Sequence, residues 1–214
     1  MRVIAVPVKS LERAKGRLSS LMRPLERAAL TLAMLEDVLD ACQAMPGWQT
    51  WVISPDEAVL EVSARRGSRP VAEEDPGLLA AVHQVEEEAA TADALAIVLG
   101  DLPLLTPEAL GGALRTVGPV VAAPSASDGG TNLLLRRPPG MIPPRFGSDS
   151  FRKHREGAEF RDIPFAEVRD PELEFDLDRP EDVPHVLAAG GPGRTRAACL
   201  EMGLAERLSV RSEP

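Results

Sequence analysis

The sequence predicts one α/β domain, in which a sheet carries helices on its faces. Apolar runs of five or six residues alternate with longer amphipathic stretches, the order of elements expected for such a sheet. The chain has 214 residues, the length of a single domain, and 44% of them are hydrophobic against 27% that are charged. That composition supplies a sizeable core, so we expect the chain to fold rather than to be disordered.

The first half of the chain predicts four strands and three helices. The run from Val3 to Val8 is rich in β-branched residues, long enough for a buried strand and too short for a helix. Pro24 suits the first turn of a helix, apolar residues then recur at spacings of three or four, and Pro46 ends the pattern. On the same grounds we expect strands at 2–8, 51–53, around Val71 and at 94–99, and helices at 24–45, 56–66 and 78–90.

The second half of the chain is less regular. Four prolines and two glycines between 137 and 147 predict a stiff loop, and Asp178 is placed to cap a helix that begins at Pro180. Glycines at 190–193 separate a domain at residues 1–190 from a C-terminal helical tail at 191–214, packed on the domain or trailing it. We expect helices at 107–116, 148–156, 180–189 and 195–208, strands at 119–123, 131–135, 160–165 and 173–177, and a turn at 128–130.

The charge balance argues against nucleic acid and membranes as partners. There are 24 Lys and Arg against 33 Asp and Glu, a net charge of −9, whereas binders of nucleic acid or anionic membranes present a cationic surface. No apolar run approaches the roughly 20 residues of a membrane span, and the chain opens on a strand-like segment rather than a signal peptide. Cys42 and Cys199 fall in helical patterns and are expected to be buried thiols, so we expect a cytoplasmic protein.

A cationic segment follows the first predicted strand. Four cations and one acid lie between Lys9 and Arg17, and Lys9 and Lys15 are two of only three lysines in a chain with 21 arginines. Open α/β sheets bind ligands beyond the carboxyl ends of their strands. A polyphosphate needs charges and donors from several directions, so this loop suits one. The alternative is a solvated amphipathic turn.

Two aspartates at predicted strand ends are candidate ligands for a divalent cation. Asp101 follows the strand at 94–99, where a desolvated carboxylate needs a partner or a metal; its alternative role is a helix or turn cap. Asp176 and Asp178 point to the same side of an extended segment. The N-terminus of the following helix can stabilise the charge of Asp178, so Asp176 is the better candidate for a metal ligand. Mg²⁺ takes one or two carboxylates and completes its shell with water and phosphate oxygens. The histidines stand singly and are expected on helix surfaces: His83, His154 and His185.

Two small-residue segments are candidate anion sites. The turn at 129–132 can bring backbone N–H groups and the Thr131 hydroxyl close to an anion. The segment 146–150 places Gly147 and Ser150 at a helix start, where free N–H groups favour phosphate or carboxylate. Joined by the proline-stiffened loop, the two segments predict a pocket for a small phosphorylated acid. Taken alone, each segment indicates only a turn of the backbone.

Together these motifs resemble the signature of the CofC/FbiD family, the guanylyltransferases of deazaflavin coenzyme F(420) biosynthesis. The resemblance runs in order from Val3 to about Asp182 and depends on the combination, because each motif alone is short. Its motifs are Pro7-Val8-Lys9-Ser10-Leu11, Ala14-Lys15-Gly16-Arg17-Leu18, Leu35-Glu36-Asp37-Val38-Leu39, Gly100-Asp101-Leu102-Pro103-Leu104-Leu105, Gly130-Thr131-Asn132, Phe146-Gly147-x-x-Ser150-Phe151-x-x-His154 and Asp176-Leu177-Asp178-x-Pro180-Glu181-Asp182.

The resemblance implies a single-domain, GT-A-like nucleotidyltransferase with a mixed, mainly parallel sheet. Its reaction joins GTP to a three-carbon phosphorylated acid (phosphoenolpyruvate, 2-phospho-L-lactate or 3-phosphoglycerate) and releases pyrophosphate. The product passes to the transferase that builds the coenzyme, and a homodimer is one option for the assembly. By motif, Lys9, Lys15 and Arg17 act on the triphosphate in catalysis, Pro7 and Gly77 adjoin the nucleotide, Thr131, Gly147 and Ser150 bind the acceptor, and Asp101 and Asp176 hold Mg²⁺ (or Mn²⁺).

The chain departs from the family at one position. The family usually has Gly-Leu-Asn at the start of the third helix, where the Asn helps to hold the nucleotide, and here Leu79 stands in its place. Leucine supplies no amide, so the departure affects the expected guanine selectivity. It also leaves open the alternative that the chain is a non-catalytic, nucleotide-binding relative of the family. A nucleotidyltransferase for a sugar phosphate or the molybdenum cofactor is a further alternative. It is disfavoured because those relatives carry Leu-Ala-Gly-Gly-x-x-x-Arg after the first strand, where this chain has Val8-Lys9-Ser10-Leu11.

Overall fold

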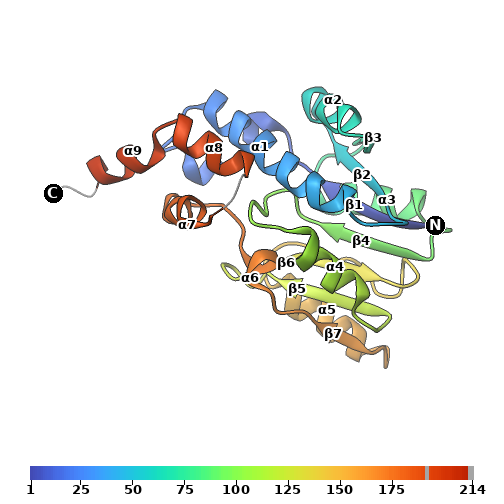
Figure 1. The fold of residues 1–214 in the computed structure, drawn as a ribbon. Helices are drawn as coiled ribbons and strands as arrows, with labels where there is room; N and C mark the ends of the chain where they lie inside the picture. The colour runs from blue at the N-terminus through green and yellow to red at the C-terminus, as the bar shows by residue number, and fades with distance from the viewer. Residues whose placement is uncertain (191–192, 212–214) are drawn as a thin grey trace.

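The computed structural model describes residues 1–190 and 193–211 and has the expected α/β architecture (Figure 1). Its strands are β1 (Arg2–Pro7), β2 (Gln49–Ser54), β3 (Arg69–Ala72), β4 (Ala94–Val98), β5 (Val120–Pro124), β6 (Thr131–Arg136) and β7 (Phe165–Glu167). They form one seven-stranded sheet in the order β3-β2-β1-β4-β6-β5-β7. β6 runs antiparallel to both of its neighbours and the other pairs are parallel, so the prediction of a mixed, mainly parallel sheet is confirmed.

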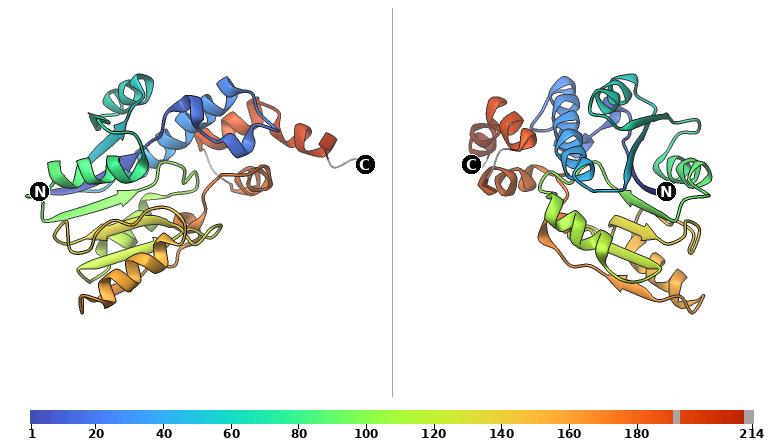
Figure 2. Two further views of the ribbon diagram at one scale, coloured as in Figure 1. Left: turned by 180° about the vertical axis from the view of Figure 1, so that it is seen from behind. Right: turned by 45° about the vertical axis from the view of Figure 1, so that its right-hand side comes forward.

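Helices cover both faces of this sheet (Figure 2). On one face lie α1 (Pro24–Gln43), α2 (Glu57–Arg65), α4 (Pro107–Arg115) and α6 (Pro171–Glu174), and on the other lie α3 (Leu78–Glu88) and α5 (Ser150–Glu159). Successive side chains of a strand point to opposite faces. In β1, Ile4 and Val6 therefore join the core under α1, while Val3 and Ala5 join the core under α3. This two-sided burial explains why the strands are near-continuous apolar runs.

The carboxyl edge of the parallel strands gathers the segments that the sequence analysis singled out. β1 and β4 end at this edge, and β6, which runs the other way, begins there at Thr131. The Leu99 N–H donates to the Asn132 carbonyl at 3.0 Å and so ties the end of β4 to the start of β6. The loop after β1 folds into two short 3-10 helices, η1 (Leu11–Arg13) and η2 (Gly16–Leu18). The fold therefore places the cationic loop and the Asp101 turn at one edge.

The predicted strand at 160–165 is wrong over most of its length. Residues 160–163 form the turn that ends α5, in which Asp162 has a left-handed backbone (φ 53°) and Phe160 is exposed. The sheet gains only Phe165–Glu167 from this region, as the short edge strand β7 beside β5. The β-branched and aromatic content of the segment indicated a strand, but the helix before it runs three residues further than expected and takes up the space.

The predicted strand at 173–177 is also wrong. Residues 171–174 form α6, because Pro171 occupies its first turn and the Asp170 carboxylate accepts a hydrogen bond from the Glu172 N–H at its start. The Asn132 side chain donates to the carbonyls of Leu173 and Glu174 at 3.0 and 3.1 Å. The Ala126 N–H, just after β5, also donates to the Glu174 carbonyl at 2.9 Å, so an amide side chain and one backbone N–H satisfy these carbonyls without strand pairing.

The described part of the predicted C-terminal tail packs against α1. The chain continues through η3 (Pro180–Asp182) and α7 (Val183–Ala188), and the expected helix at 195–208 is two helices, α8 (Arg194–Glu201) and α9 (Leu204–Arg211), which meet at Gly203 with φ 61°. The Thr195 N–H and hydroxyl both donate to the Asp37 carboxylate, at 2.9 and 2.6 Å. Leu204 joins a core with Leu30 of α1. Residues 191–192 and 212–214 of the predicted tail lie outside the described residues.

Both cysteines are buried and free, as the sequence predicted. Burial raises the pKa of the Cys42 thiol to about 12 and that of the Cys199 thiol to about 11, so neither is a reactive thiolate near neutral pH. Within residues 1–190 and 193–211, every helix is too short or too polar to cross a bilayer.

Candidate active site

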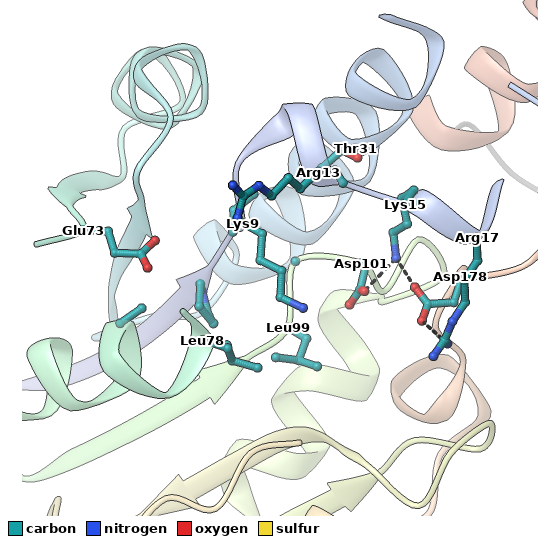
Figure 3. A pocket seen from close by; sticks show the side chains of 16 residues that line it. Lys9, Arg13, Lys15, Arg17, Thr31, Glu73, Leu78, Leu99, Asp101 and Asp178 are labelled. Atoms are coloured by element: carbon teal, nitrogen blue, oxygen red, sulfur yellow. Dashed lines mark hydrogen bonds and ion pairs between the residues drawn. The ribbon is translucent and has the colours of Figure 1, made fainter. Parts of the chain in front are cut away.

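A cavity of about 330 Å³ lies at the carboxyl edge of the sheet (Figure 3). The loop after β1, the turn after β4 and the start of α3 contribute to its wall. Five of the residues predicted from the sequence line it: Pro7, Lys9, Lys15, Arg17 and Asp101. The cationic segment therefore faces a cavity, although Lys9, Arg13 and Arg17 are also exposed to solvent.

Lys15 lies at the centre of an ion-pair network in this cavity. Its Nζ is 2.7 Å from Asp101 Oδ2 and 2.6 Å from Asp178 Oδ1, and its side chain is 6% exposed (Figure 3). Arg17 Nη1 lies 3.1 Å from the other oxygen of Asp178. The backbone of Lys15 is left-handed (φ 51°), a strained conformation for a residue other than glycine. This conformation turns the chain between η1 and η2 so that the ammonium reaches both carboxylates.

The network keeps Lys15 and Asp178 charged. Burial alone would lower the pKa of Lys15, but the adjacent carboxylates of Asp101 and Asp178 raise it above its ordinary value. Burial alone would raise the pKa of Asp178, but the positive charges of Lys15, Arg17 and Lys9 hold that pKa below its ordinary value. The cavity therefore carries fixed cations beside fixed carboxylates at neutral pH.

Asp178 is not the helix cap that the sequence predicted. The carboxylate of Asp182 accepts hydrogen bonds from the backbone N–H groups of Asp178 and Arg179, at 2.8 and 2.6 Å, and caps η3 instead. The side chain of Asp178 is thereby free to turn toward Lys15. The partner of Asp178 is therefore Lys15 and not the N-terminus of the following helix.

The structure brings Asp101 and Asp176 into the same neighbourhood. The Leu177 N–H donates to the Asp101 carbonyl at 3.3 Å, and the Asp176 carboxylate, 8% exposed, accepts hydrogen bonds from the Ser125 and Ser127 hydroxyls at 2.8 and 3.2 Å. Burial raises the pKa of Asp176; the Ser125 hydrogen bond opposes this, and the negative charges of Asp101 and Asp178 add to it. Two nearby carboxylates that repel each other favour a cation between them.

The carboxyl groups fit a hard divalent cation. The Oδ1 atom of Asp101 is buried and has no hydrogen-bond partner among the described residues, so it is available to a ligand. Among residues 1–190 and 193–211, no group of three or more His, Cys, Asp and Glu side chains is placed to hold a metal ion by itself. Two carboxylates with remaining positions for water and phosphate oxygens match the preference of Mg²⁺, which is rarely enclosed by protein alone.

The predicted acceptor residues Thr131 and Ser150 form a buried hydrogen-bond cluster with His154. The backbone N–H of Arg145 donates to His154 Nε2 at 2.8 Å, so the ring carries its proton on Nδ1 and donates it to Thr131 Oγ1 at 3.0 Å. Ser150 Oγ donates to the same Thr131 oxygen at 3.0 Å. Thr131 Oγ1 then accepts two hydrogen bonds, and its own O–H is left to donate to a ligand.

The expectation that His154 lies on a helix surface is wrong. His154 is completely buried, because α5 turns this face toward the start of β6, and the ring of Phe146 packs edge-on against it at 5.3 Å. Burial, together with the charges of Arg136 and Arg145, lowers the pKa of the imidazole to about 3. The ring is therefore a neutral, fixed donor at physiological pH.

We expect the buried imidazole to make the protein less stable as the pH falls from about 6.5 towards 4. Between its unfolded pKa near 6.5 and its folded pKa of about 3, the unfolded state binds a proton that the folded state does not bind. The free energy of unfolding should fall by up to about 1.4 kcal/mol per pH unit in this range. Urea unfolding of wild type and His154→Gln at several pH values measures this, because the difference between the two slopes isolates His154. Equal slopes would contradict the assignment.

Other predicted residues lie beside the cavity rather than in its wall. Thr131, Ser150 and Gly147 belong to the cluster next to it, on the α5 side of the sheet, and Gly147 has φ 119°, which explains the glycine. Gly77, also with a positive φ, starts α3 and donates its N–H to the Glu73 carboxylate. Leu79, at the position of the family asparagine, is exposed and does not line the cavity.

Sequence reasoning missed several residues of the site. Arg13 and Glu73 line the cavity, and Ser125 and Ser127 hold Asp176. Arg13 was counted only as one of the four cations between Lys9 and Arg17, and it belongs with them. Glu73 directly follows a strand at the same carboxyl edge, so the rule that located Asp101 applies to it as well. The serines carry no such signal, because their role depends on contact with a segment about 50 positions away.

The sequence matches a known family over nearly its full length. The family described as "Guanylyl transferase CofC like" matches residues 1–211. The chain is 39% identical over 197 residues to the phosphoenolpyruvate guanylyltransferase of Rubrobacter xylanophilus, covering 89% of this chain and 96% of the relative. It is 37% identical over 197 residues to the 3-phospho-D-glycerate guanylyltransferase of Phenylobacterium zucineum, covering 87% and 89%.

Solved structures share the fold. A crystal structure from Desulfovibrio desulfuricans G20, described as a nucleotide-diphospho-sugar transferase, superimposes with a TM-score of 0.80 over 97% of this chain and 99% of that one. The two sequences are 18% identical, so this likeness concerns the architecture of the sheet and helices.

Proposed function

The chain belongs to the family of CofC-like guanylyl transferases, and from this premise we propose that it joins GTP to a three-carbon phosphorylated acid and releases pyrophosphate. The acceptor is phosphoenolpyruvate, 2-phospho-L-lactate or 3-phosphoglycerate, and the first and last of these appear in the names of the relatives above. The product belongs to coenzyme F(420) biosynthesis, as the family resemblance implies.

The observation that carries the proposal is the buried ammonium of Lys15 between Asp101 and Asp178, in a cavity lined by further cations. Lys9, Lys15 and Arg17 offer positive charge from several directions to a triphosphate, the arrangement that polyphosphate binding needs. Pro7 and Gly77 adjoin the place of the nucleotide, at the end of β1 and the start of α3. Of the two proposed metal ligands, Asp101 lines the cavity and Asp176 adjoins it next to Leu177, whose N–H donates to the Asp101 carbonyl; two such carboxylates fit the divalent cation that accompanies a nucleoside triphosphate.

The reaction we propose is an in-line displacement at the α-phosphorus of GTP. A phosphate oxygen of the acceptor forms the new P–O bond, and the bond to the β-phosphate breaks, so that pyrophosphate leaves on the opposite side. The ionised phosphate needs no strong general base, so the protein acts by positioning and charge neutralisation. Lys9, Lys15 and Arg17 neutralise charge on the α-phosphate and the leaving group.

Asp101 and Asp176 would hold Mg²⁺ or Mn²⁺, which supplies further positive charge to the phosphates when bound. The acceptor is assigned to Thr131, Gly147 and Ser150. The Thr131 hydroxyl has a donor to offer an anion, because His154 and Ser150 already donate to its oxygen. Thr131 lies at the start of β6, directly beside the end of β4 that leads to Asp101, which supports an acceptor position next to the nucleotide.

Pyrophosphate release tests the proposal. The protein with Mg²⁺ and GTP is mixed with each of the three acids in turn, and the guanylylated product is identified by mass spectrometry. We expect release with GTP and one or more of the acids, and none with GTP alone. Release only with a sugar phosphate, or GTP binding without release under any pairing, would overturn the proposal in favour of the alternatives named in the sequence analysis.

We further propose that the protein acts in the cytoplasm and passes its product to the transferase that builds the coenzyme. Two buried, unpaired thiols support a reducing compartment. The transfer of product and the homodimer stay predictions from the family resemblance.

A further inference from the structure

Glu73 stands at the end of the cavity away from the Lys15 network. It follows β3 directly, and Figure 3 shows its carboxylate turned toward the cavity on the side opposite Asp101 and Asp178. Those two aspartates are both bonded to Lys15. Among the described residues, no lysine or arginine forms an ion pair with Glu73, which distinguishes it from the other carboxylates of the wall. Its charge is therefore available to something that enters the cavity.

The Glu73 side chain is oriented by the backbone. Its own N–H donates to the Ser54 carbonyl at 3.0 Å, which ties it to the end of β2. Its Oε1 accepts the N–H of Gly77, and Gly77 adopts φ 119° at the start of α3. One oxygen is thus fixed against the backbone with a lone pair left over, while Oε2 has both of its lone pairs to offer.

The charge distribution decides which part of a nucleotide can lie against Glu73. This step rests on the proposed function, in which the cavity takes a nucleoside triphosphate. The phosphates are attracted by Lys9, Lys15 and Arg17 and repelled by an uncompensated carboxylate. The nucleotide therefore lies with its phosphates toward Lys15 and its base toward Glu73. Leu78 and Ala81 of α3 supply apolar surface at the wall.

We propose that Glu73 selects guanine by accepting hydrogen bonds from its N1–H and its exocyclic amino group. Guanine presents these two donors side by side, and a carboxylate presents two acceptors at a matching spacing. Adenine and cytosine each place one donor beside an acceptor on the same edge, so the acceptor would face a carboxylate oxygen. Uracil has one donor between two acceptors. Two acceptors therefore fit guanine and no other common base.

This assignment accounts for the departure at Leu79. A leucine that is exposed and lies outside the cavity wall neither supplies nor blocks a contact with the base. Guanine selectivity in this chain then comes from the end of β3 rather than from the first turn of α3.

Glu73→Gln tests the proposal because it replaces one hydrogen-bond acceptor of the side chain with a donor. The Gly77 N–H holds the amide oxygen, so the amide NH₂ must face the base in place of Oε2. A donor there opposes the amino group of guanine and matches the 2-oxo group of xanthine. By titration calorimetry, we expect GDP to bind about tenfold or more weakly than to wild type, and xanthosine diphosphate to bind more tightly than to wild type. Glu74→Gln, an exposed neighbour, is the matched control and should bind both as wild type does.

Unchanged affinity of Glu73→Gln for both nucleotides would overturn the proposal, as would equal weakening of both. Because binding is measured without an acceptor, the result is separate from the reaction. If wild type binds GDP with the expected selectivity and yet releases no pyrophosphate with any acid, the proposed function fails and Glu73 keeps its role. If wild type binds no guanine nucleotide, both fail.

Discussion

Asp101→Asn is expected to lower the rate of guanylyl transfer by about 10³-fold while the protein still folds. The substitution keeps the shape of the side chain and an oxygen for Lys15, but it removes the negative charge that the divalent cation needs. The unfolding free energy should change by only about 1 kcal/mol, because Lys15 keeps Asp178 and the repulsion of Asp176 by Asp101 disappears. Steady-state pyrophosphate release across a Mg²⁺ titration, with urea unfolding alongside, measures both effects.

The matched control is Asp162→Asn. It makes the same chemical change at an exposed turn, where the left-handed backbone suits asparagine as well as aspartate. This variant should have the activity and the Mg²⁺ dependence of wild type. Near-normal, Mg²⁺-dependent turnover in Asp101→Asn would remove Asp101 from the metal site and leave Asp176 without its proposed partner.

The location of the site was predictable because it follows from topology. Buried apolar runs identify parallel strands, parallel strands end at one edge, and polar residues after those ends must gather there. This rule located Asp101 at the end of β4. Asp176, 75 positions away, reaches the same neighbourhood although the strand predicted for it does not form, and the Leu177–Asp101 hydrogen bond joins the two segments. Lys9 and Lys15 were expected at that edge for the same reason, and both line the cavity.

The pairing of side chains within the site was not predictable in the same way. Asp178 looked like a helix cap because a helix follows it, but Asp182, four residues further on, caps η3 by accepting the N–H groups of Asp178 and Arg179. His154 looked exposed because its neighbours on α5 are charged, whereas the face of the helix that meets β6 depends on tertiary packing. For His154 the packing of distant segments decided the outcome, whereas for Asp178 a nearby residue took the capping role and the distant Lys15 took the carboxylate.

The failed strand at 173–177 has a related cause. A short run with apolar residues at alternate positions fits a strand as well as a single helical turn, and the sequence does not show which carbonyls will find a partner. Here the Asn132 side chain donates to the carbonyls of Leu173 and Glu174, and the Ala126 N–H also donates to Glu174, so these carbonyls have partners although the segment forms no strand. The aspartates that follow then lie in an irregular segment, where their side chains point toward different partners.

Lys15→Met is expected to abolish most of the activity and to change the pH dependence of stability. Activity should fall by about 10²–10³-fold, because a positioned charge beside the transferring phosphate is lost. The unfolding free energy near pH 7 should fall by about 1–3 kcal/mol, since the half-buried Asp101 then has no cation and Asp178 keeps only Arg17. Methionine keeps the length of the side chain, so the change tests the charge rather than the packing.

The pH dependence gives Lys15→Met a signature of its own. In wild type the pKa of Asp178 is held low, so its contribution to stability is present above its unfolded pKa of about 3.9 and is lost as the pH falls through the folded value. The pKa of Lys15 is raised, so its contribution is present below about 10.5 and is lost as the pH rises through the folded value. In the variant Asp101 has no cation and Asp178 has only Arg17, so the two carboxylates destabilise the fold until they are protonated. The stability gap between the two proteins should therefore narrow as the pH is lowered from about 7 to 4.

Lys15→Met/Asp178→Asn separates the two roles of the lysine. Removing one carboxylate together with the ammonium restores part of the charge balance, so the double variant should regain most of the stability lost near neutral pH. It should not regain activity, because no cation has returned to the place of the triphosphate. Recovery of turnover along with stability would mean that Lys15 serves the fold alone, and the phosphate-binding role would have to pass to Lys9 and Arg17.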